Sequence, residues 1–104
     1  MELKNKLKKK RVFITGHNGF KGTWLTLYFG LIGSKIKGYS LKPSLDKKKF
    51  FYELNSKNDC LEEEYGDIRD LKKLSKSINN FKPDIVYHFA SQAIVLNAIE
   101  DPIY

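Results

Sequence analysis

The chain has 104 residues, of which 41% are hydrophobic and 13% aromatic, and its formal net charge is +7. This length excludes two complete domains, and the composition is that of a globular chain and not of a disordered one. No stretch approaches the ~20 apolar residues needed to span a bilayer, and no apolar segment follows the lysine-rich N-terminus, so we expect neither membrane insertion nor a signal peptide.

The positive charge is concentrated at the N-terminus. Residues 1–11 hold six of the 19 basic residues and one of the 12 acidic ones, which accounts for +5 of the net charge. The rest of the chain is close to balance, so we expect residues 1–10 to be a solvated basic tail and the protein to bind no nucleic acid. A nucleic-acid-binding arm is the alternative for this tail. Cys60 has no second cysteine with which to form a disulfide or a zinc site, so we expect a cytoplasmic protein without a metal centre.

Residues 11–39 predict one β-α-β unit. The β-branched and aromatic run at 11–15 ends abruptly at Gly16, as a buried strand does. The segment from Phe20 to Gly33 predicts an amphipathic helix with a glycine at its C-terminal end. Its apolar stripe comprises Phe20, Trp24, Leu27, Tyr28, Leu31 and Ile32. Residues 35–39 alternate polar and less polar side chains and predict a second strand.

The second half of the chain predicts two more strands. In chain order we expect a mostly irregular segment over 41–58, a strand over 61–65, a helix from Asp70 to about residues 79–80, a buried strand over 84–90 and a helix beginning near Gln92. Pro43 and Ser44 argue against regular structure in the first of these segments, and the alternative is a turn or two of helix over residues 50–54. The strand over 61–65 contains three consecutive glutamates, so we expect it at an edge of the sheet. Asp70 is a good capping residue, and apolar residues recur at helical spacing after it.

Strands that alternate with helices predict an α/β fold with a doubly wound parallel sheet, helices on both faces and right-handed crossovers. Four strands and the beginning of a further helix make up only the N-terminal half of such a sheet. We therefore expect residues 11–104 to form an incomplete Rossmann domain.

A glycine-rich segment joins the first predicted strand to the first predicted helix. Gly16, Gly19 and Gly22 occupy its positions one, four and seven, which at this location is typical of a dinucleotide-binding turn. We expect them to allow the tight turn, the approach of a pyrophosphate, and close packing of the helix, in that order. An NTPase phosphate-binding loop is disfavoured, because the Gly-Lys order that it needs is transposed here to Lys21-Gly22. A glycine-rich turn that only links strand and helix is the structural alternative.

Four segments of the chain resemble one family in the same order. They are residues 11–25, 38–43, 66–70 and 83–92. The chain resembles the extended short-chain dehydrogenase/reductases and, within them, the CDP-glucose 4,6-dehydratases. The histidine after the first glycine and the Phe-Lys-Gly-x-Trp-Leu continuation separate this group from related epimerases and dehydratases.

The resemblance implies which residues would hold the cofactor. Around the pyrophosphate it places Gly16, His17, Asn18, Gly19, Phe20, Lys21 and Gly22, and toward the nicotinamide end it places Ala90, Ser91 and Gln92. Asp67 would accept a hydrogen bond from the adenine amine, and Ile68 would pack on the adenine ring. Without the resemblance, the alternative for His17 is an imidazole on a surface loop, and the alternative for Asp67 is a turn or capping residue. For Ala90, Ser91 and Gln92 the alternative is a small-residue strand-to-helix turn.

The cofactor implied by the resemblance is NAD, although the residues themselves leave NADP open. Ser40 and Leu41 stand where a carboxylate usually binds the ribose 2′-hydroxyl, and Lys42 is close by. The family's catalytic Tyr-x-x-x-Lys is not found, because no tyrosine before Tyr104 has a lysine four residues later. We therefore expect no catalytic residue in this chain.

The implied function is that of the cofactor-binding N-terminal portion of a CDP-glucose 4,6-dehydratase-like enzyme. Such an enzyme oxidises the sugar at C4, removes water across C5 and C6, and reduces C6 to give CDP-4-keto-6-deoxyglucose for surface polysaccharide synthesis. The resemblance implies CDP-glucose or a related sugar nucleotide as substrate and a homodimer for the full-length enzyme, and we expect no turnover by this chain alone. The alternatives are a non-catalytic nucleotide-binding module and the N-terminal part of another sugar-nucleotide epimerase or dehydratase.

Overall fold

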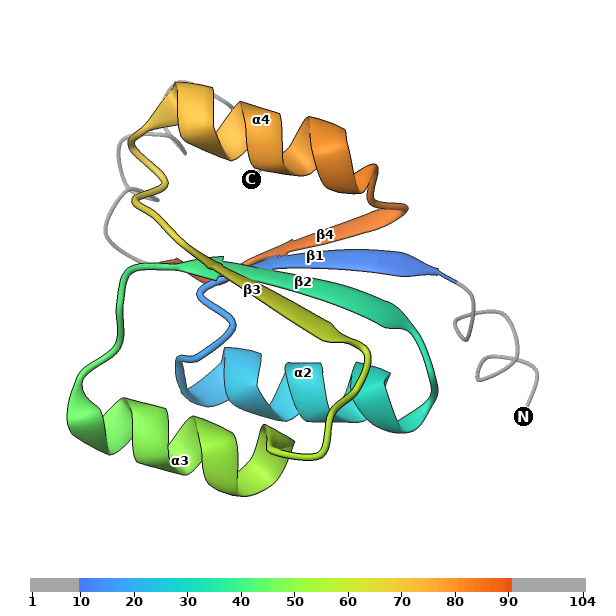
Figure 1. Cartoon of the computed structure of the whole chain (residues 1–104), viewed down its shortest axis with the longest axis vertical. Helices are drawn as coiled ribbons and strands as arrows, with labels where there is room; N and C mark the ends of the chain where they lie inside the picture. Colours follow the sequence, from blue (N-terminus) through green and yellow to red (C-terminus); the bar gives the residue numbers. More distant parts are fainter. Residues whose placement is uncertain (1–9, 91–104) are drawn as a thin grey trace.

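The computed structural model of the chain describes residues 10–90. In this part of the chain, four strands alternate with three helices (Figure 1). In chain order they are β1 (Arg11–Thr15), α2 (Phe20–Leu31), β2 (Lys35–Ser40), α3 (Leu45–Asn55), β3 (Leu61–Tyr65), α4 (Leu71–Phe81) and β4 (Ile85–His88). No helix among these residues is long and apolar enough to cross a membrane.

The strands form one parallel sheet in the order β3-β2-β1-β4. The chain starts inside the sheet with β1, adds β2 and β3 on one side, and returns to the other side of β1 with β4. In Figure 1, α2 and α3 cover one face of the sheet and α4 covers the opposite face. The predicted α/β class, a partial Rossmann fold with a doubly wound parallel sheet, is confirmed. In such sheets ligands bind at the carboxyl ends of the strands, where the strand order reverses.

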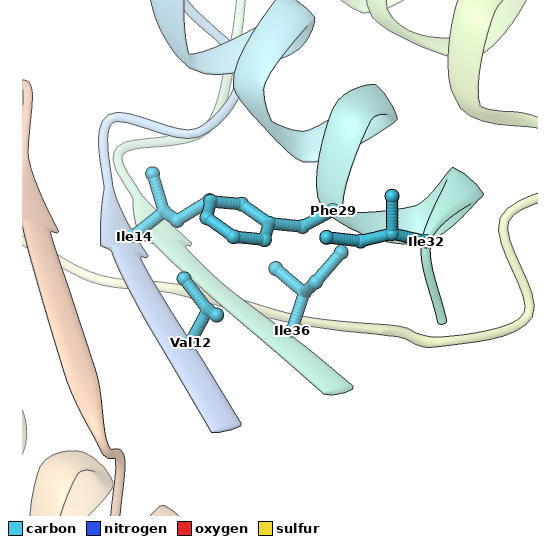
Figure 2. Close-up of a cluster of buried hydrophobic side chains, with 5 residues drawn as sticks. All are labelled: Val12, Ile14, Phe29, Ile32 and Ile36. Carbon is cyan, nitrogen blue, oxygen red and sulfur yellow. The ribbon is translucent and has the colours of Figure 1, made fainter. Parts of the chain in front are cut away.

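One hydrophobic core lies between the sheet and α2. Val12 and Ile14 of β1 pack there with Phe29, Ile32 and Ile36 (Figure 2). All five side chains are buried, and they come from β1, α2, the end of that helix and β2. This core fixes the direction in which α2 leaves the end of β1.

The opposite face of the sheet has its own core beneath α4. Phe13 packs there with Tyr39, Ile68 and Phe81, and its ring centroid lies 6.1 Å from that of Tyr39 and 6.2 Å from that of Phe81. Successive side chains of a strand point to opposite faces, so Phe13 points away from the α2 core. The predicted burial of the first strand is therefore confirmed on both faces of the sheet.

The prediction of a mostly irregular segment over 41–58 was wrong, because residues 45–55 form α3. Ser44 is its N-cap and accepts a hydrogen bond from the Lys47 backbone N–H at 3.4 Å. The three lysines at residues 47–49 lie on the exposed side of this helix. Lysine is a good helix former, so these residues are compatible with a helix as well as with a loop. Phe51 and Asn55, four residues apart, form the buried side. The turn signals at residues 43–44 mark the beginning of the helix.

Most of the apolar stripe that predicted α2 does not face the core, although Ile32 at its end does. Phe20, Trp24, Tyr28 and Leu31 are exposed by 44–74%, and the buried residues of this helix are instead Gly22, Thr23, Thr26 and Phe29. The outer aromatics contact α3, because the Phe50 ring lies 6.0 Å from that of Phe20 and 6.3 Å from that of Trp24. Small residues face inward because a helix can approach a sheet closely only where its side chains are short.

The remaining element predictions agree closely with the structure. β3 lies at an edge of the described sheet, as its glutamates predicted. Two of them, Glu62 and Glu64, form ion pairs with Lys37 of β2 at 3.3 and 3.0 Å. Asp70 caps α4 through the Lys73 N–H. β4 is shorter than predicted, since it ends at residue 88, and its predicted burial was wrong, because it lies at the other edge of the described sheet and none of its residues is fully buried. The helix predicted near Gln92 lies outside the described residues.

Candidate functional site

A pocket of about 430 Å³ lies at the carboxyl ends of the strands, a volume suited to a small ligand. Its lining comes from four connections of the sheet. The residues are Gly16, Asn18 and Gly19 after β1; Ser40, Leu41, Lys42, Pro43, Ser44 and Lys47 after β2; Gly66, Asp67, Ile68 and Arg69 after β3; and Phe89 and Ala90 after β4. The pocket therefore occupies the position that doubly wound sheets use for ligands.

The glycine-rich turn forms one wall of the pocket. Gly16 has a φ of 72°, the left-handed conformation of a tight turn, and its N–H donates to the Tyr39 carbonyl at 2.8 Å. Gly19 is the N-cap of α2 and makes no side-chain capping hydrogen bond, and the first turn of the helix carries no acidic residue. The N-terminal N–H groups and the positive end of the helix dipole are thus left for an anion at the pocket wall.

Gly22 packs α2 directly against this turn. A Cβ at this position would lie 2.2 Å from the Gly16 carbonyl oxygen and 2.7 Å from the His17 Cα. Both neighbours are backbone atoms that cannot rotate away. The close approach that was predicted for Gly22 therefore brings the helix onto the turn that lines the pocket.

Two polar side chains connect the turn to the end of β2. Asn18 is almost fully buried, and its Nδ2 donates to Ser40 Oγ at 2.8 Å. Ser40 Oγ in turn donates to the Leu41 carbonyl at 2.9 Å. The end of β2 therefore carries a serine whose hydroxyl is already hydrogen-bonded, followed by the apolar Leu41. Neither residue supplies a carboxylate for the ribose.

Asp67 lies in the pocket wall after β3 and is bound by its neighbour. The Asp67 carboxylate accepts hydrogen bonds from the Arg69 backbone N–H at 2.9 Å, from its Nε at 3.0 Å and from its Nη2 at 2.6 Å. These contacts lower the pKa of Asp67 to about 2 and raise the pKa of Arg69. Asp67 is therefore a charged acceptor, and it is also the turn residue that its sequence alone suggested.

The other residues named from the sequence are divided between the pocket and its surroundings. Ile68 lines the pocket but is 7% exposed, because most of its side chain belongs to the core beneath α4. Ala90 lines the pocket at the end of β4. Phe20 and Lys21 are exposed and do not line it. Ser91 and Gln92 lie outside the described residues.

His17 lies on the side of the turn away from the pocket. It is fully buried, so the alternative of a surface imidazole was wrong. Its Nε2 lies 2.7 Å from Glu63 Oε1, and its ring meets the Phe51 ring edge-on at 5.2 Å. Tyr52 OH donates to the other oxygen of Glu63 at 2.6 Å. Sequence reasoning missed this cluster because its members come from β1–α2, β3 and the undetected helix α3.

Cationic side chains also line the pocket wall, and of these only Lys42 was placed near the cofactor from the sequence. Lys42, Lys47 and Arg69 line it beside Ser44, the N-cap of α3. Lys47 and Ser44 were assigned to an irregular segment, so no signal placed them near the glycine-rich turn. Among residues 10–90 no group of histidine, cysteine or acidic side chains is arranged to hold a metal ion.

Replacing Glu63 by glutamine is expected to reduce the acid sensitivity of the protein. Burial disfavours the Glu63 carboxylate, but hydrogen bonds from His17 and Tyr52 outweigh it and leave its pKa below the ordinary 4.5. The charged group therefore contributes stability that is fully present above pH 4.5 and is lost as the pH falls through the lower folded-state pKa. We expect the difference in unfolding free energy between wild type and Glu63→Gln, measured by urea denaturation, to be constant near neutral pH and to shrink below pH 4.5. A difference that grows in acid would contradict this assignment.

The family profile for GDP-mannose 4,6-dehydratase matches residues 13–104. This range includes all four connections that line the pocket. The chain belongs to the GDP-mannose 4,6-dehydratase family. It is 47% identical to CDP-glucose 4,6-dehydratase from Salmonella typhimurium over 104 aligned positions, which cover 96% of this chain and 27% of that protein. It is 27% identical to GDP-mannose 4,6-dehydratase from Vibrio cholerae, over 92% of this chain and 27% of that protein. The chain thus spans about a quarter of the length of these two relatives.

Solved structures agree with the fold of this family member. An epimerase from Methanothermobacter thermautotrophicus matches 99% of the chain and 29% of its own length, with a TM-score of 0.71 and 26% identity. UDP-glucose 4-epimerase from Brucella ovis, solved in complex with NAD, matches 90% of the chain and 26% of its own length, with a TM-score of 0.62 and 23% identity. The second likeness shows the shared Rossmann-type fold alone.

Proposed function

We propose that the pocket binds the adenosine and pyrophosphate portion of NAD, and that residues 11–104 are the cofactor-binding portion of a CDP-glucose 4,6-dehydratase-like enzyme. One observation carries this proposal: the turn from Gly16 to Gly19 presents an uncapped helix N-terminus to the pocket. Such an N-terminus favours a phosphate group. The 47% identity to the Salmonella CDP-glucose 4,6-dehydratase supports the substrate class.

The residues present fit an adenosine diphosphate group. The glycine-rich turn offers backbone N–H groups to the pyrophosphate, and Asn18 holds that turn to β2. Lys42 and Lys47 add positive charge on the facing wall. The Asp67 carboxylate, which is oriented by Arg69, can accept a hydrogen bond from the adenine amine. Ala90 lies at the end of β4, from which the site would continue toward the nicotinamide.

The family relationship supports further proposals about the full-length enzyme. When bound, NAD supplies the hydride chemistry for oxidation at C4 of the sugar and reduction at C6, with loss of water between these steps. We propose CDP-glucose or a related sugar nucleotide as substrate of the full-length enzyme, a cytoplasmic homodimer whose product serves surface polysaccharide synthesis. Residues 1–10 form a basic tail outside the cofactor-binding portion.

Replacing Asp67 by alanine is expected to weaken NADH binding by ~10-fold, because an acceptor for the adenine amine is lost. Calorimetric titration of the whole chain with NADH measures this effect. Asp59→Ala is the matched control, because Asp59 is an exposed carboxylate just before β3, near the opposite end of the strand. Equal NADH affinity in the two variants would remove Asp67 from the site, and no binding by the wild type would overturn the proposed function.

The chain alone is expected not to turn over CDP-glucose. It can hold the cofactor, but it carries no tyrosine before Tyr104 with a lysine four residues later to act on the sugar. Incubation with NAD and CDP-glucose, followed by chromatography of the nucleotides, checks this expectation. Formation of a 4-keto-6-deoxy product would show that catalytic residues lie within these 104 residues.

A further inference from the structure

His17 is part of the glycine-rich turn, and its side chain packs on the face of the sheet that α2 and α3 cover. The ring is fully buried against Phe51 of α3 and above Gly38 of β2. A Cβ on Gly38 would lie 2.2 Å from the His17 Cγ, so the imidazole occupies the space that a side chain in the middle of β2 would fill. This packing fixes the position of the His17 ring relative to two secondary-structure elements.

A chain of hydrogen bonds adds two further attachments. His17 Nε2 lies 2.7 Å from Glu63 Oε1, and Tyr52 OH donates to Glu63 Oε2 at 2.6 Å. A carboxylate only accepts, so His17 Nε2 carries the hydrogen of the first bond. Burial opposes the charge on Glu63, but the two hydrogen bonds and nearby Lys48 hold its pKa below the ordinary value. Tyr65 also faces Tyr52, whose own pKa is raised chiefly by its hydrogen bond to Glu63.

The same elements form the walls of the pocket. Gly16 and Asn18, the two neighbours of His17 in the chain, both line it. The first residues of α3 line it at Ser44 and Lys47, and the loop after β3 lines it from Gly66 onward. The hydrogen-bonded chain His17–Glu63–Tyr52 therefore links the turn to the two elements whose ends form the facing walls.

We propose that His17 is a positioning residue for the nucleotide: through Glu63 and Tyr52 it holds the phosphate-facing backbone of the turn in place without touching the ligand. This inference rests on the proposed function for the identity of the ligand. It assigns to the imidazole the role of a hydrogen-bond donor, and the effect of losing that donor should concentrate on the pyrophosphate. The adenosine end, which is bound by the loop after β3, should be much less affected.

Two substitutions separate the donor from the ring. In His17→Gln the amide nitrogen can take the place of Nε2 and still donate to Glu63, whereas in His17→Asn the shorter amide reaches only the position of Nδ1. Both variants lose the aromatic ring, so His17→Gln is the matched control for packing. The probes are ADP, which carries the pyrophosphate, and adenosine, which lacks it, each titrated into the whole chain. Amide hydrogen exchange of the unliganded variants reports on the turn itself.

We expect His17→Asn to weaken ADP binding by ~10-fold and adenosine binding by less than about twofold, and His17→Gln to bind ADP within about threefold of the wild type. In His17→Asn the amides of Gly16 and Gly19, which donate to Tyr39 and Gly16 carbonyls, should exchange ~10-fold faster. The Ile36 amide lies near the start of β2, far from the turn, and donates to the Cys60 carbonyl. Its exchange rate should be unchanged.

The other outcomes overturn distinct statements. If His17→Asn matches the wild type in ADP affinity and in exchange, the positioning role is wrong and the proposed function stands. If His17→Asn and His17→Gln are equally weakened, ring packing and not the hydrogen bond holds the turn, which also overturns the inference. If the wild type binds neither ADP nor adenosine, the proposed function fails, and the exchange rates then decide whether His17 positions the turn.

Discussion

Replacing Gly22 by alanine is expected to lower the free energy of unfolding by about 2 kcal/mol and to weaken NADH binding at least ~10-fold. The added Cβ would lie 2.2 Å from the Gly16 carbonyl oxygen and 2.8 Å from the His17 carbonyl carbon. Overpacking of this kind costs up to about 3 kcal/mol, and the better helix propensity of alanine returns about 1 kcal/mol. Because the contacts are with backbone atoms, the strain can be relieved only if α2 or the turn moves.

The functional part of this result follows from where the movement occurs. Displacement of the Gly16 carbonyl shifts the same turn that lines the pocket, so stability and nucleotide affinity should fall together. Urea denaturation and NADH titration of the same preparation measure both quantities. Gly19→Ala is the control for stability, since its Cβ would lie 3.5 Å from the Gly16 carbonyl oxygen, an ordinary contact, and should cost less than about 1 kcal/mol. Unchanged stability of Gly22→Ala would show that the helix and the turn are not in close contact.

Replacing Gly38 by alanine is expected to destabilise the protein by about 1–3 kcal/mol for a different reason. Here the Cβ would meet a side chain, the buried His17 ring, at 2.2 Å from its Cγ. His17 can step aside only at a cost, because its ring lies 2.7 Å from the Glu63 carboxylate and faces Phe51 on α3. Either the imidazole moves and its hydrogen bond is lost, or the strand shifts.

A double-mutant cycle tests this cause directly. If the ring is what opposes the new methyl group, Gly38→Ala should cost much less in a His17→Ala background than in the wild type, with a coupling of about 1 kcal/mol or more. The free energies of unfolding of the four proteins are compared by urea denaturation. Additive costs would mean that Gly38 is needed for the backbone of β2 and not for the imidazole.

The class of the fold could be predicted from local patterns alone. The apolar run of β1 is buried on both faces, and Asp70 caps α4, because these features depend on residues adjacent in the chain. The glycine-rich turn lies between the predicted strand and helix, and Gly16, which was expected to allow the tight turn, has a left-handed φ there. A strand, a glycine-rich turn and a helix in this order place a helix N-terminus at the carboxyl end of the strand, where a phosphate can bind. This local arrangement depends little on distant residues.

Two features could not be predicted because distant segments decide them. The apolar stripe of α2 faces outward, where Phe50 of α3 contacts Phe20 and Trp24, and a pattern of apolar spacing does not say which neighbour covers it. Residues 41–58 were predicted to be mostly irregular because proline, serine and lysine are typical of exposed loops. The burial of Phe51 and Asn55, which identifies α3 as a packed helix, is visible only in the fold.

The sequence by itself determined the four strands, the helices α2 and α4, the nucleotide-type turn and the family resemblance, since each depends on residues that are neighbours in the chain. The tertiary structure decided the surroundings of that turn: the cations of the opposite wall, the Asp67–Arg69 pair in its folded geometry, and the burial of His17. His17 and Glu63 are 46 residues apart in the chain, and they meet because the parallel sheet places β3 beside β2 and α3 beneath both. Contacts of that separation arise only when the chain folds, because they depend on strand order and helix placement and not on any local pattern.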